Sequence, residues 1–486
     1  MADSISFLRL LEPWALHESA VPLRAKSSLL EVEPLECDNA LYESTLTGRI
    51  MSEERMIVDF VPFGYDVDKL LVRFHETADY VDVFVIYEMP YTLLGVPKSL
   101  LFDEICKQPR FKAFADKIIY LHPDVAGMQK VLHTTRAAID RVLDANIRGH
   151  RNRVQRGKEK GDEGKVGGEA PGQVRLEPDM YAINFFFDRD MVRQFNEIGR
   201  IGSTSGERDT RRSRLNQSLK EKLQEQHENG RSVYAIQNDG DELVEGDVLR
   251  HLRHCELRAD VSRIYTPCFS FKGNYHWLQT TRDMRSFGFG QDTSAGMLSK
   301  LGGFLKKKLE HVFGKGLEPE LNKYLWKLGP YLWPLSVVVK SEHLMRRNFS
   351  EDVFFEHHMG YGAATHMSAV NDPVEHWLRT CGTVEMVHAC ADIVPAVVRK
   401  AAARGRVTSK LLFDHAVFPW CHSSNPSVHT DSLSHEARQV VLKSVPWVVR
   451  NNPSYFPFML PVSGLKGTGL YEQVLHREWA DRCTEY

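Results

Sequence analysis

The sequence lacks several features that would place it in a simple class. Its formal net charge is only −2 over 486 residues, so no overall field of one sign recruits nucleic acid or a membrane. No window approaches the roughly eighteen continuous apolar residues of a membrane span. The first residues carry no basic stretch followed by a long apolar one. We therefore expect neither a signal peptide nor a membrane anchor in this sequence.

The cysteines are equally uninformative in their spacing. All eight are scattered, without a Cys-x-x-Cys pair or the spacing of zinc ligands. This pattern is typical of free thiols in a reducing compartment, and the alternative is a secreted enzyme with a few disulfides. The compartment stays open on this observation.

What is present is the composition of a globular protein, with 42% hydrophobic and 10% aromatic residues. The length suggests about two to three domains, or one α/β core with insertions. Strands are predicted at 56–63, 81–88 and 116–124, with an amphipathic helix between the first two. This alternation favours a mostly parallel sheet whose ligands bind beyond the carboxyl ends of its strands. The triple phenylalanine within residues 181–202 suggests a further buried strand.

Composition also predicts how the chain is divided. The expected parts are an extension at 1–55, a core at 56–465 and a tail at 466–486. Within the core, residues 146–177 are rich in glycine and charge and predict a solvated, mobile insertion, in preference to an RNA-binding arm. A second insertion is expected at 285–335. It includes the basic amphipathic segment 295–316, which either carries a solvated lysine edge or lies on a membrane surface.

An acidic cluster follows the apolar run that ends at Ile236. Asp239, Asp241 and Glu242 fall within four positions, with Gly240 between the first two. If the strand continues, Asp239 and Asp241 point to the same side of it. Two converging carboxylates repel each other unless a cation lies between them, and such oxygen ligands suit Mg²⁺ or Mn²⁺ with phosphate oxygens completing the shell. The alternative is an ordinary Asp/Gly-rich surface turn.

Ordered motifs between residues 59 and 121 resemble glycosyltransferase family 17, which is typified by the bisecting β-1,4-N-acetylglucosaminyltransferase. The motifs are Leu71-Val-Arg-Phe-His-Glu76, Val81-Asp-Val-Phe-Val-Ile-Tyr-Glu88, Thr92, Gly95-Val-Pro-Lys98 and Asp116-Lys-Ile-Ile-Tyr120. The acidic motif Asp-x-Asp-Glu of the family is intact at 239–242. A later Gly-Trp-His-x-Ser motif is degraded at 364–368, where His366 and Ser368 remain and the tryptophan is lost.

The resemblance implies a GT-A-like, Rossmann-like α/β fold, with a mostly parallel sheet and helices on both faces. It implies a metal-dependent inverting transferase that moves N-acetylglucosamine from UDP-GlcNAc to a glycan or glycoprotein acceptor, N-glycan-like, in β-1,4 linkage. Mn²⁺ or Mg²⁺ would be the cofactor, and nucleic acid would not be a partner. Animal members of the family are anchored Golgi proteins, so the expected location is a secretory compartment or, without an anchor, the cytoplasm. The alternative function is a catalytically inactive binding module for glycan, membrane or protein.

The resemblance and the chemistry together assign roles to individual residues. Asp241 would be a direct metal ligand, Glu242 would orient the others, and Asp239 would hold ribose or a metal-bound water. Tyr275 and Trp277 are candidates to stack on an acceptor sugar, with core packing as the alternative. The remaining candidates are His366 for the metal or diphosphate; Glu88, Thr92, Lys98, Arg212 and Ser368 for the nucleotide sugar; and Glu356 or Glu385 for the general base.

Overall fold

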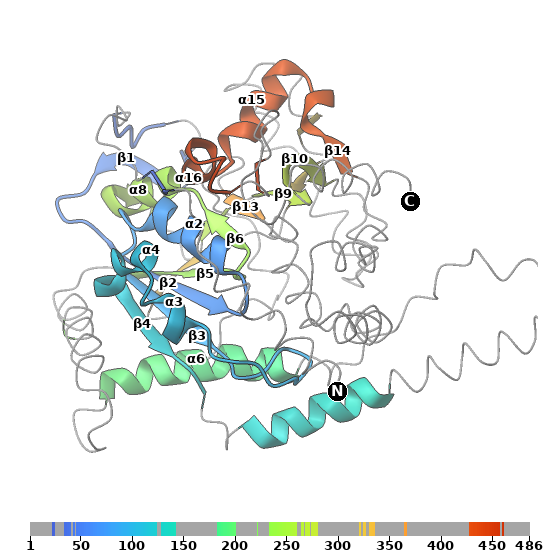
Figure 1. Ribbon diagram of the computed structural model, residues 1–486. Coiled ribbons are helices and arrows are strands. Elements are labelled where there is room, and N and C mark those ends of the chain that lie inside the picture. The colour runs from blue at the N-terminus through green and yellow to red at the C-terminus, as the bar shows by residue number, and fades with distance from the viewer. Residues whose placement is uncertain are drawn as a thin grey trace, which may run out of the picture.

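The computed structural model in Figure 1 arranges the described part of the chain around three β-sheets. The described residues are 22–24, 34–39, 42–43, 45–123, 128–141, 182–200, 221, 233–259, 264–266, 268–272, 274–279, 320–321, 324–326, 330–335, 364–366, 427–456 and 459–460. Several predicted features lie outside these residues: the insertion 146–177, the segment 295–316, Arg212, Ser368, Glu356 and Glu385.

The main sheet has six strands in the order β4-β3-β2-β5-β12-β8. The strands are β2 (Met56–Phe63), β3 (Val83–Glu88), β4 (Ile118–Leu121), β5 (Val233–Gln237), β8 (Ile264–Tyr265) and β12 (Tyr331–Pro334). β4, β3, β2 and β5 run parallel, whereas β12 is antiparallel to both β5 and β8. The predicted strands in the first third of the chain are thus confirmed, and the sheet as a whole is mixed.

The parallel strands are apolar because both of their faces are covered. Alternate residues of β2 enter two different cores, with Ile57 and Val61 on one side and Val58 and Phe60 on the other. The first side packs against α2 (Val67–Thr77), and the short segments α3 (Phe102–Ile105), α4 (Pro109–Lys112) and η2 (Ala115–Lys117) follow β3 in the chain. The second side packs against α6 (Ala182–Arg200) and the helical residues 128–141.

The strand predicted around the triple phenylalanine is wrong. These residues belong to the 19-residue helix α6, which runs along one side of the main sheet in Figure 1. Ile183, Phe186 and Phe195 contact the second core, together with Met191 and Val192. Their spacing follows the helical period over the whole segment, and this period outweighs three consecutive aromatic residues.

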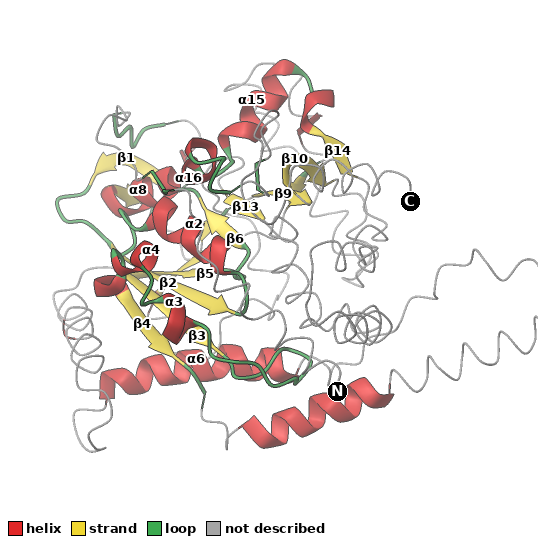
Figure 2. Ribbon diagram, viewed as in Figure 1, coloured by secondary structure: helices red, strands yellow, loops and turns green. Residues whose placement is uncertain are grey.

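A second sheet has the order β14-β10-β9-β13-β6, and β11 pairs with β9. Figure 2 shows its strands beside the C-terminal helices α15 and α16. The elements are β6 (Glu242–Val244), β9 (Cys268–Lys272), β10 (Asn274–Gln279), β11 (Leu325–Trp326), β13 (Ala364–His366), β14 (Ser427–His429), η7 (Thr430–Ser432), α15 (His435–Lys443) and α16 (Trp447–Asn451). The chain passes from the main sheet to this one between β5 and β6, which is where the acidic cluster lies.

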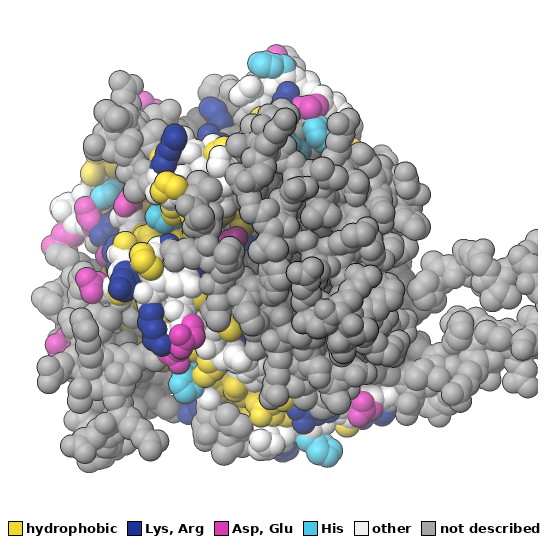
Figure 3. Space-filling model, in the orientation of Figure 1, with side chains coloured by type: hydrophobic (Ala, Val, Ile, Leu, Met, Phe, Trp, Pro, Cys, Tyr) yellow, Lys and Arg dark blue, Asp and Glu magenta, His cyan; other side chains and the backbone are white. Residues whose placement is uncertain are grey.

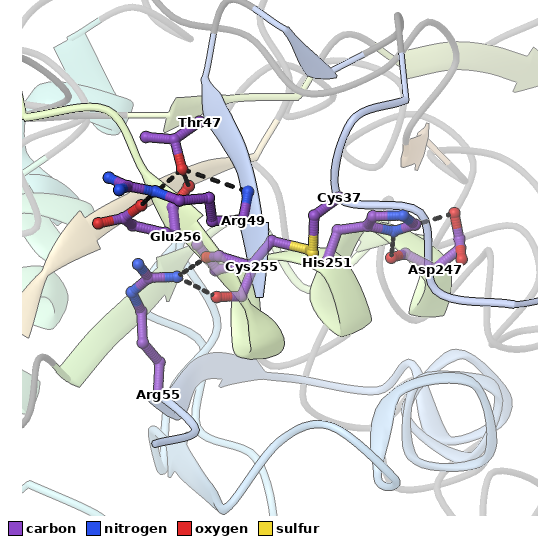
Figure 4. Close-up of a disulfide and its surroundings, with 9 residues drawn as sticks. Cys37, Thr47, Arg49, Arg55, Asp247, His251, Cys255 and Glu256 are labelled. Atoms are coloured by element: carbon purple, nitrogen blue, oxygen red, sulfur yellow. Dashed lines mark hydrogen bonds and ion pairs between the residues drawn. A yellow bond between two sulfur atoms is a disulfide. The ribbon is translucent and has the colours of Figure 1, made fainter. Parts of the chain in front are cut away.

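The N-terminal extension is tied to the core at two places. β1 (Leu46–Ile50) pairs with β7 (Cys255–Leu257), which follows α8 (Gly246–His254). A disulfide joins Cys37 to Cys255, 218 positions apart (Figure 4). The expectation of free thiols is therefore wrong for this pair. It fails because cysteines that are distant in sequence meet through the fold, while Cys106 and Cys268 are not joined in disulfides.

Two further observations concern the helices and one face of the described part of the chain. Within the described residues, no helix combines the length and apolar composition needed to cross a membrane. On the face shown in Figure 3, basic and acidic side chains lie next to one another.

Candidate functional site

The acidic cluster forms a tight turn between the two large sheets. β5 ends at Gln237 and β6 begins at Glu242. The turn is closed by the Glu242 amide, which donates to the Asp239 carbonyl oxygen at 3.0 Å. The Glu242 side chain folds back and accepts from the Asp239 amide at 3.1 Å. Glu242 therefore stabilises the turn itself.

The two aspartates do not share a face, so the alternation expected from a continuing strand is wrong. The strand stops before them, and the turn leaves Asp239 exposed and Asp241 buried, with 1% of its surface accessible. One carboxylate is thus available at the surface of the turn and the other lies beneath it. The turn follows the carboxyl end of a central parallel strand, which is where α/β sheets bind their ligands.

The buried side chain of Arg73 is hydrogen-bonded to the backbone of the acidic turn. The sequence alone assigned this residue no individual role. Its Nη2 donates to three main-chain carbonyl oxygens, those of Asp239 at 3.0 Å, Gly240 at 3.3 Å and Glu242 at 2.5 Å. Its Nη1 donates to both carboxylate oxygens of Asp59 at 3.2 and 3.1 Å. Both side chains are 1% exposed. Burial raises the pKa of the Asp59 carboxyl, and the positive charge of Arg73 opposes that rise.

A signal for this pair was present in the sequence. Asp59 is a carboxylate inside a strand that is otherwise apolar, and Arg73 lies on the helix that follows it. A charged residue in a doubly covered strand requires a buried partner, because an unpaired buried charge is costly. The sequence could not say that the partner would also hold the acidic turn.

The strand register brings residue 366 to the acidic motif. In the antiparallel pair of β13 and β6, His366 lies opposite Glu242, and in the parallel pair of β13 and β9 it lies beside Ser270. The side chain of His366 lies outside the description, as does that of Trp277. The backbone places Trp277 opposite His429, in the pair of β10 and β14.

Side chains in and beside the loop after β3 bind other groups of the protein, as seen at Glu88, Thr92 and Lys98. The Glu88 carboxylate accepts four hydrogen bonds, from Lys98 Nζ at 2.5 Å, the Leu101 amide at 2.8 Å, the Phe102 amide at 2.9 Å and the Tyr120 hydroxyl at 2.9 Å. Thr92 Oγ1 accepts from the Val96 amide at 3.2 Å within the same loop. These contacts shape the loop after β3, and Lys98 is paired with Glu88 inside the protein, unlike the solvated lysine of the alternative.

Tyr275 lies in the core. Its side chain is fully buried and its ring packs against Phe271, with the ring centroids 4.9 Å apart. The sugar-stacking role expected for this residue therefore has no exposed ring to support it. The alternative of core packing describes Tyr275 in this structure.

The acidic turn carries two carboxylates, one exposed at Asp239 and one buried at Asp241, of the type that binds a small divalent cation. Among the described residues, no group of three or more His, Cys, Asp or Glu side chains is arranged to enclose a metal by itself. Mg²⁺ and Mn²⁺ in nucleotide sites often take one or two carboxylates, and water or phosphate oxygens supply the rest. Asp239 and Asp241 offer carboxylate oxygens of this kind.

Comparison with known proteins identifies a family for an early stretch of the chain, which does not include the acidic turn. Residues 42–148 match the model of one protein family. That family is glycosyltransferase family 17. The match to family 17 includes Asp59, Arg73 and Glu88, and it ends before the acidic turn. The resemblance inferred from the motifs is thereby confirmed for this stretch.

Curated relatives of the chain match over a short segment. The beta-1,4-mannosyl-glycoprotein 4-beta-N-acetylglucosaminyltransferases of Rattus norvegicus and Homo sapiens are each 34% identical over 70 residues, and that of Mus musculus is 33% identical. The aligned segment covers 14% of this chain and 13% of each relative. No solved structure matches the chain.

Proposed function

We propose that this chain is a metal-dependent inverting glycosyltransferase. It would transfer N-acetylglucosamine from UDP-GlcNAc to an N-glycan-like acceptor on a glycoprotein, in β-1,4 linkage. One observation carries the proposal: Arg73, inside the stretch that matches family 17, binds three carbonyl oxygens of an acidic turn that lies far along the chain. The matched segment and the acidic motif are therefore in direct contact, which supports one shared site.

The proposal includes a GT-A-like arrangement of the fold. Support comes from four parallel strands whose carboxyl ends lie at one edge, and from an Asp-Gly-Asp-Glu turn directly after β5. Helices that pack on both sides of this sheet also support the proposed arrangement.

Each residue of the turn has a separate task in this proposal. Asp239 and Asp241 would hold Mn²⁺ or Mg²⁺, which when bound supplies positive charge to the diphosphate leaving group. Glu242 keeps the turn closed through its contact with the Asp239 amide. His366, opposite Glu242 in the register, is proposed as a further group directed to the metal or diphosphate. Glu88 supports the neighbouring loop through its internal hydrogen bonds.

The first experiment measures UDP release from UDP-GlcNAc with Mn²⁺ and an N-glycan acceptor. Wild-type protein should release UDP, and chelation of the metal should stop it. Asp241→Asn and Asp239→Asn should each reduce the rate on the order of 100-fold or more, since charge stabilisation of the leaving group is lost. Glu104→Gln is the matched control, because Glu104 is an exposed carboxylate with a surface partner.

The second experiment distinguishes a transferase from the binding-module alternative. Calorimetry with UDP and Mn²⁺ should show binding by wild type and much weaker binding by Asp241→Asn. Glycan binding without any metal-dependent UDP binding would support the binding module instead. Absence of both UDP binding and UDP release would refute the transferase proposal.

A further inference from the structure

We infer that Asp59 and Arg73 form a positioning device for the acidic turn, with Arg73 fixing the turn backbone and Asp59 acting through Arg73. The inference rests on the proposed function, because it concerns how the turn is made ready for a cation. Neither residue would touch the donor or the metal.

The contacts of Arg73 divide between one acid and three carbonyl oxygens. Its Nη1 meets both oxygens of Asp59, and its Nη2 meets the main chain at residues 239, 240 and 242. Its Nε has no hydrogen-bond partner within the described part of the chain. None of these bonds ends on the carboxylate of Asp239 or Asp241. Arg73 thus fixes the turn through its backbone and does not compete with a cation for the acidic side chains.

Asp59 is needed because a buried guanidinium requires a counterion. It lies in the middle of β2, at a position that faces α2, and Arg73 comes from that helix. The contact of Nη1 with both oxygens of Asp59 orients the planar guanidinium of Arg73, so that Nη2 points to the turn. Lysine offers a single point charge and cannot reproduce this two-sided geometry.

The chain contains a matched pair at the opposite end of the same strands. Arg253 donates to both oxygens of Asp82 at 2.7 and 3.2 Å and to the Tyr80 carbonyl oxygen at 2.9 Å. Asp82 also accepts from the amide of Ile57, near the amino end of β2. This pair joins the same two side-chain types, is less buried at 18% and 11% exposure, and has no hydrogen bond to the acidic turn among the described residues. A substitution in this pair therefore serves as a control, because it lowers stability without changing the contacts of the turn.

The experiment measures Mn²⁺ binding in the presence of UDP, by the electron paramagnetic resonance signal of free Mn²⁺. Arg73→Gln should raise the dissociation constant of Mn²⁺ about 10- to 100-fold, as expected for residues that orient metal ligands. Arg253→Gln should leave it unchanged although it also removes a bidentate pair. Mn²⁺ binding by Arg73→Gln at wild-type strength would overturn the inference.

Two further variants separate positioning from folding. Asp59→Asn combined with Arg73→Gln removes both buried charges and should recover much of the stability lost in Arg73→Gln, without recovering Mn²⁺ affinity. Arg73→Lys keeps the charge and should still bind Mn²⁺ weakly. Wild-type affinity in either variant would overturn the inference, and both remain usable if Arg73→Gln does not fold.

Hydrogen exchange measured in the absence of metal tests this inference separately from the proposed function. In wild type the amides of Asp239 and Glu242 are both hydrogen-bonded inside the turn. Hydrogen exchange at these amides should accelerate in Arg73→Gln and stay unchanged in Arg253→Gln. If wild type fails to bind Mn²⁺ and UDP, the proposed function fails, and this exchange measurement still decides whether Arg73 positions the turn. Equal protection in both variants would refute the positioning role.

Discussion

A methyl group on Gly240 would lie 2.6 Å from the carbonyl oxygen of Pro62, because the acidic turn packs directly against the end of β2. Glycine is therefore required at position 240 so that the turn can approach the backbone of β2 closely. The requirement does not come from a left-handed φ angle at Gly240. Gly64 lies two residues after Pro62, and a methyl group added to Gly64 would have no atom within 4 Å. The two glycines form a natural comparison.

Gly240→Ala should destabilise the protein by about 1–3 kcal/mol, since the clash is with backbone and not with a flexible side chain. It should also weaken Mn²⁺ binding in the presence of UDP. Chemical denaturation and Mn²⁺ titration measure the two effects. Gly64→Ala should change stability by no more than about 0.5 kcal/mol. Equal effects of the two substitutions would show that the contact with Pro62 is not limiting.

Loss of the Cys37–Cys255 disulfide should lower stability by about 2–4 kcal/mol, because the bridge closes a long loop. Cys37→Ser and Cys255→Ser should have the same effect. Peptide mapping without reductant should recover the two cysteines in one linked peptide from protein folded under oxidising conditions. Cys106→Ser is the control, since Cys106 is not part of a disulfide. Recovery of Cys37 and Cys255 as separate thiols would contradict the bridge.

Glu88→Gln should destabilise the protein by about 3–5 kcal/mol, because it removes one partner of a buried ion pair with Lys98. Adding Lys98→Met should recover part of the loss. Glu104→Gln, in an exposed pair with Lys107, should change stability by less than about 1 kcal/mol. A higher KM for the donor at unchanged stability would instead support the direct nucleotide contact that the sequence suggested for Glu88.

His75 should make stability dependent on pH in the mildly acidic range. Its side chain packs against Phe114, and burial lowers its pKa from 6.5 to about 4. Between these two values the unfolded state binds more protons than the folded one, so stability should fall as pH falls from 6.5 towards 4.

His75→Leu should flatten the pH dependence of the unfolding free energy between pH 6.5 and 4, measured by urea denaturation across this range. His435→Gln is the control substitution, at an exposed histidine at the start of α15. A slope that persists in His75→Leu would assign the effect to other groups.

Periodicity was enough to locate β2, α2, β3 and β4. Their apolar residues repeat with the period of the element that they form, and each element is covered by others, so local pattern and burial agree. The same rule failed for α6 when three consecutive phenylalanines were given more weight than the spacing over the full segment. It also failed at Asp239 and Asp241, because a turn interrupts the alternation of a strand.

The sequence by itself determined the family resemblance, the intact Asp-Gly-Asp-Glu motif and the parallel strands that precede it. These depend on residue types and on spacing along the chain. Only the tertiary structure decided that Arg73 binds the backbone of that motif, that Glu88 is saturated by internal hydrogen bonds and that Cys37 meets Cys255. The physical reason is that each of these contacts joins segments whose distance in space is set by the packing of the sheets and helices, and local sequence does not encode that distance.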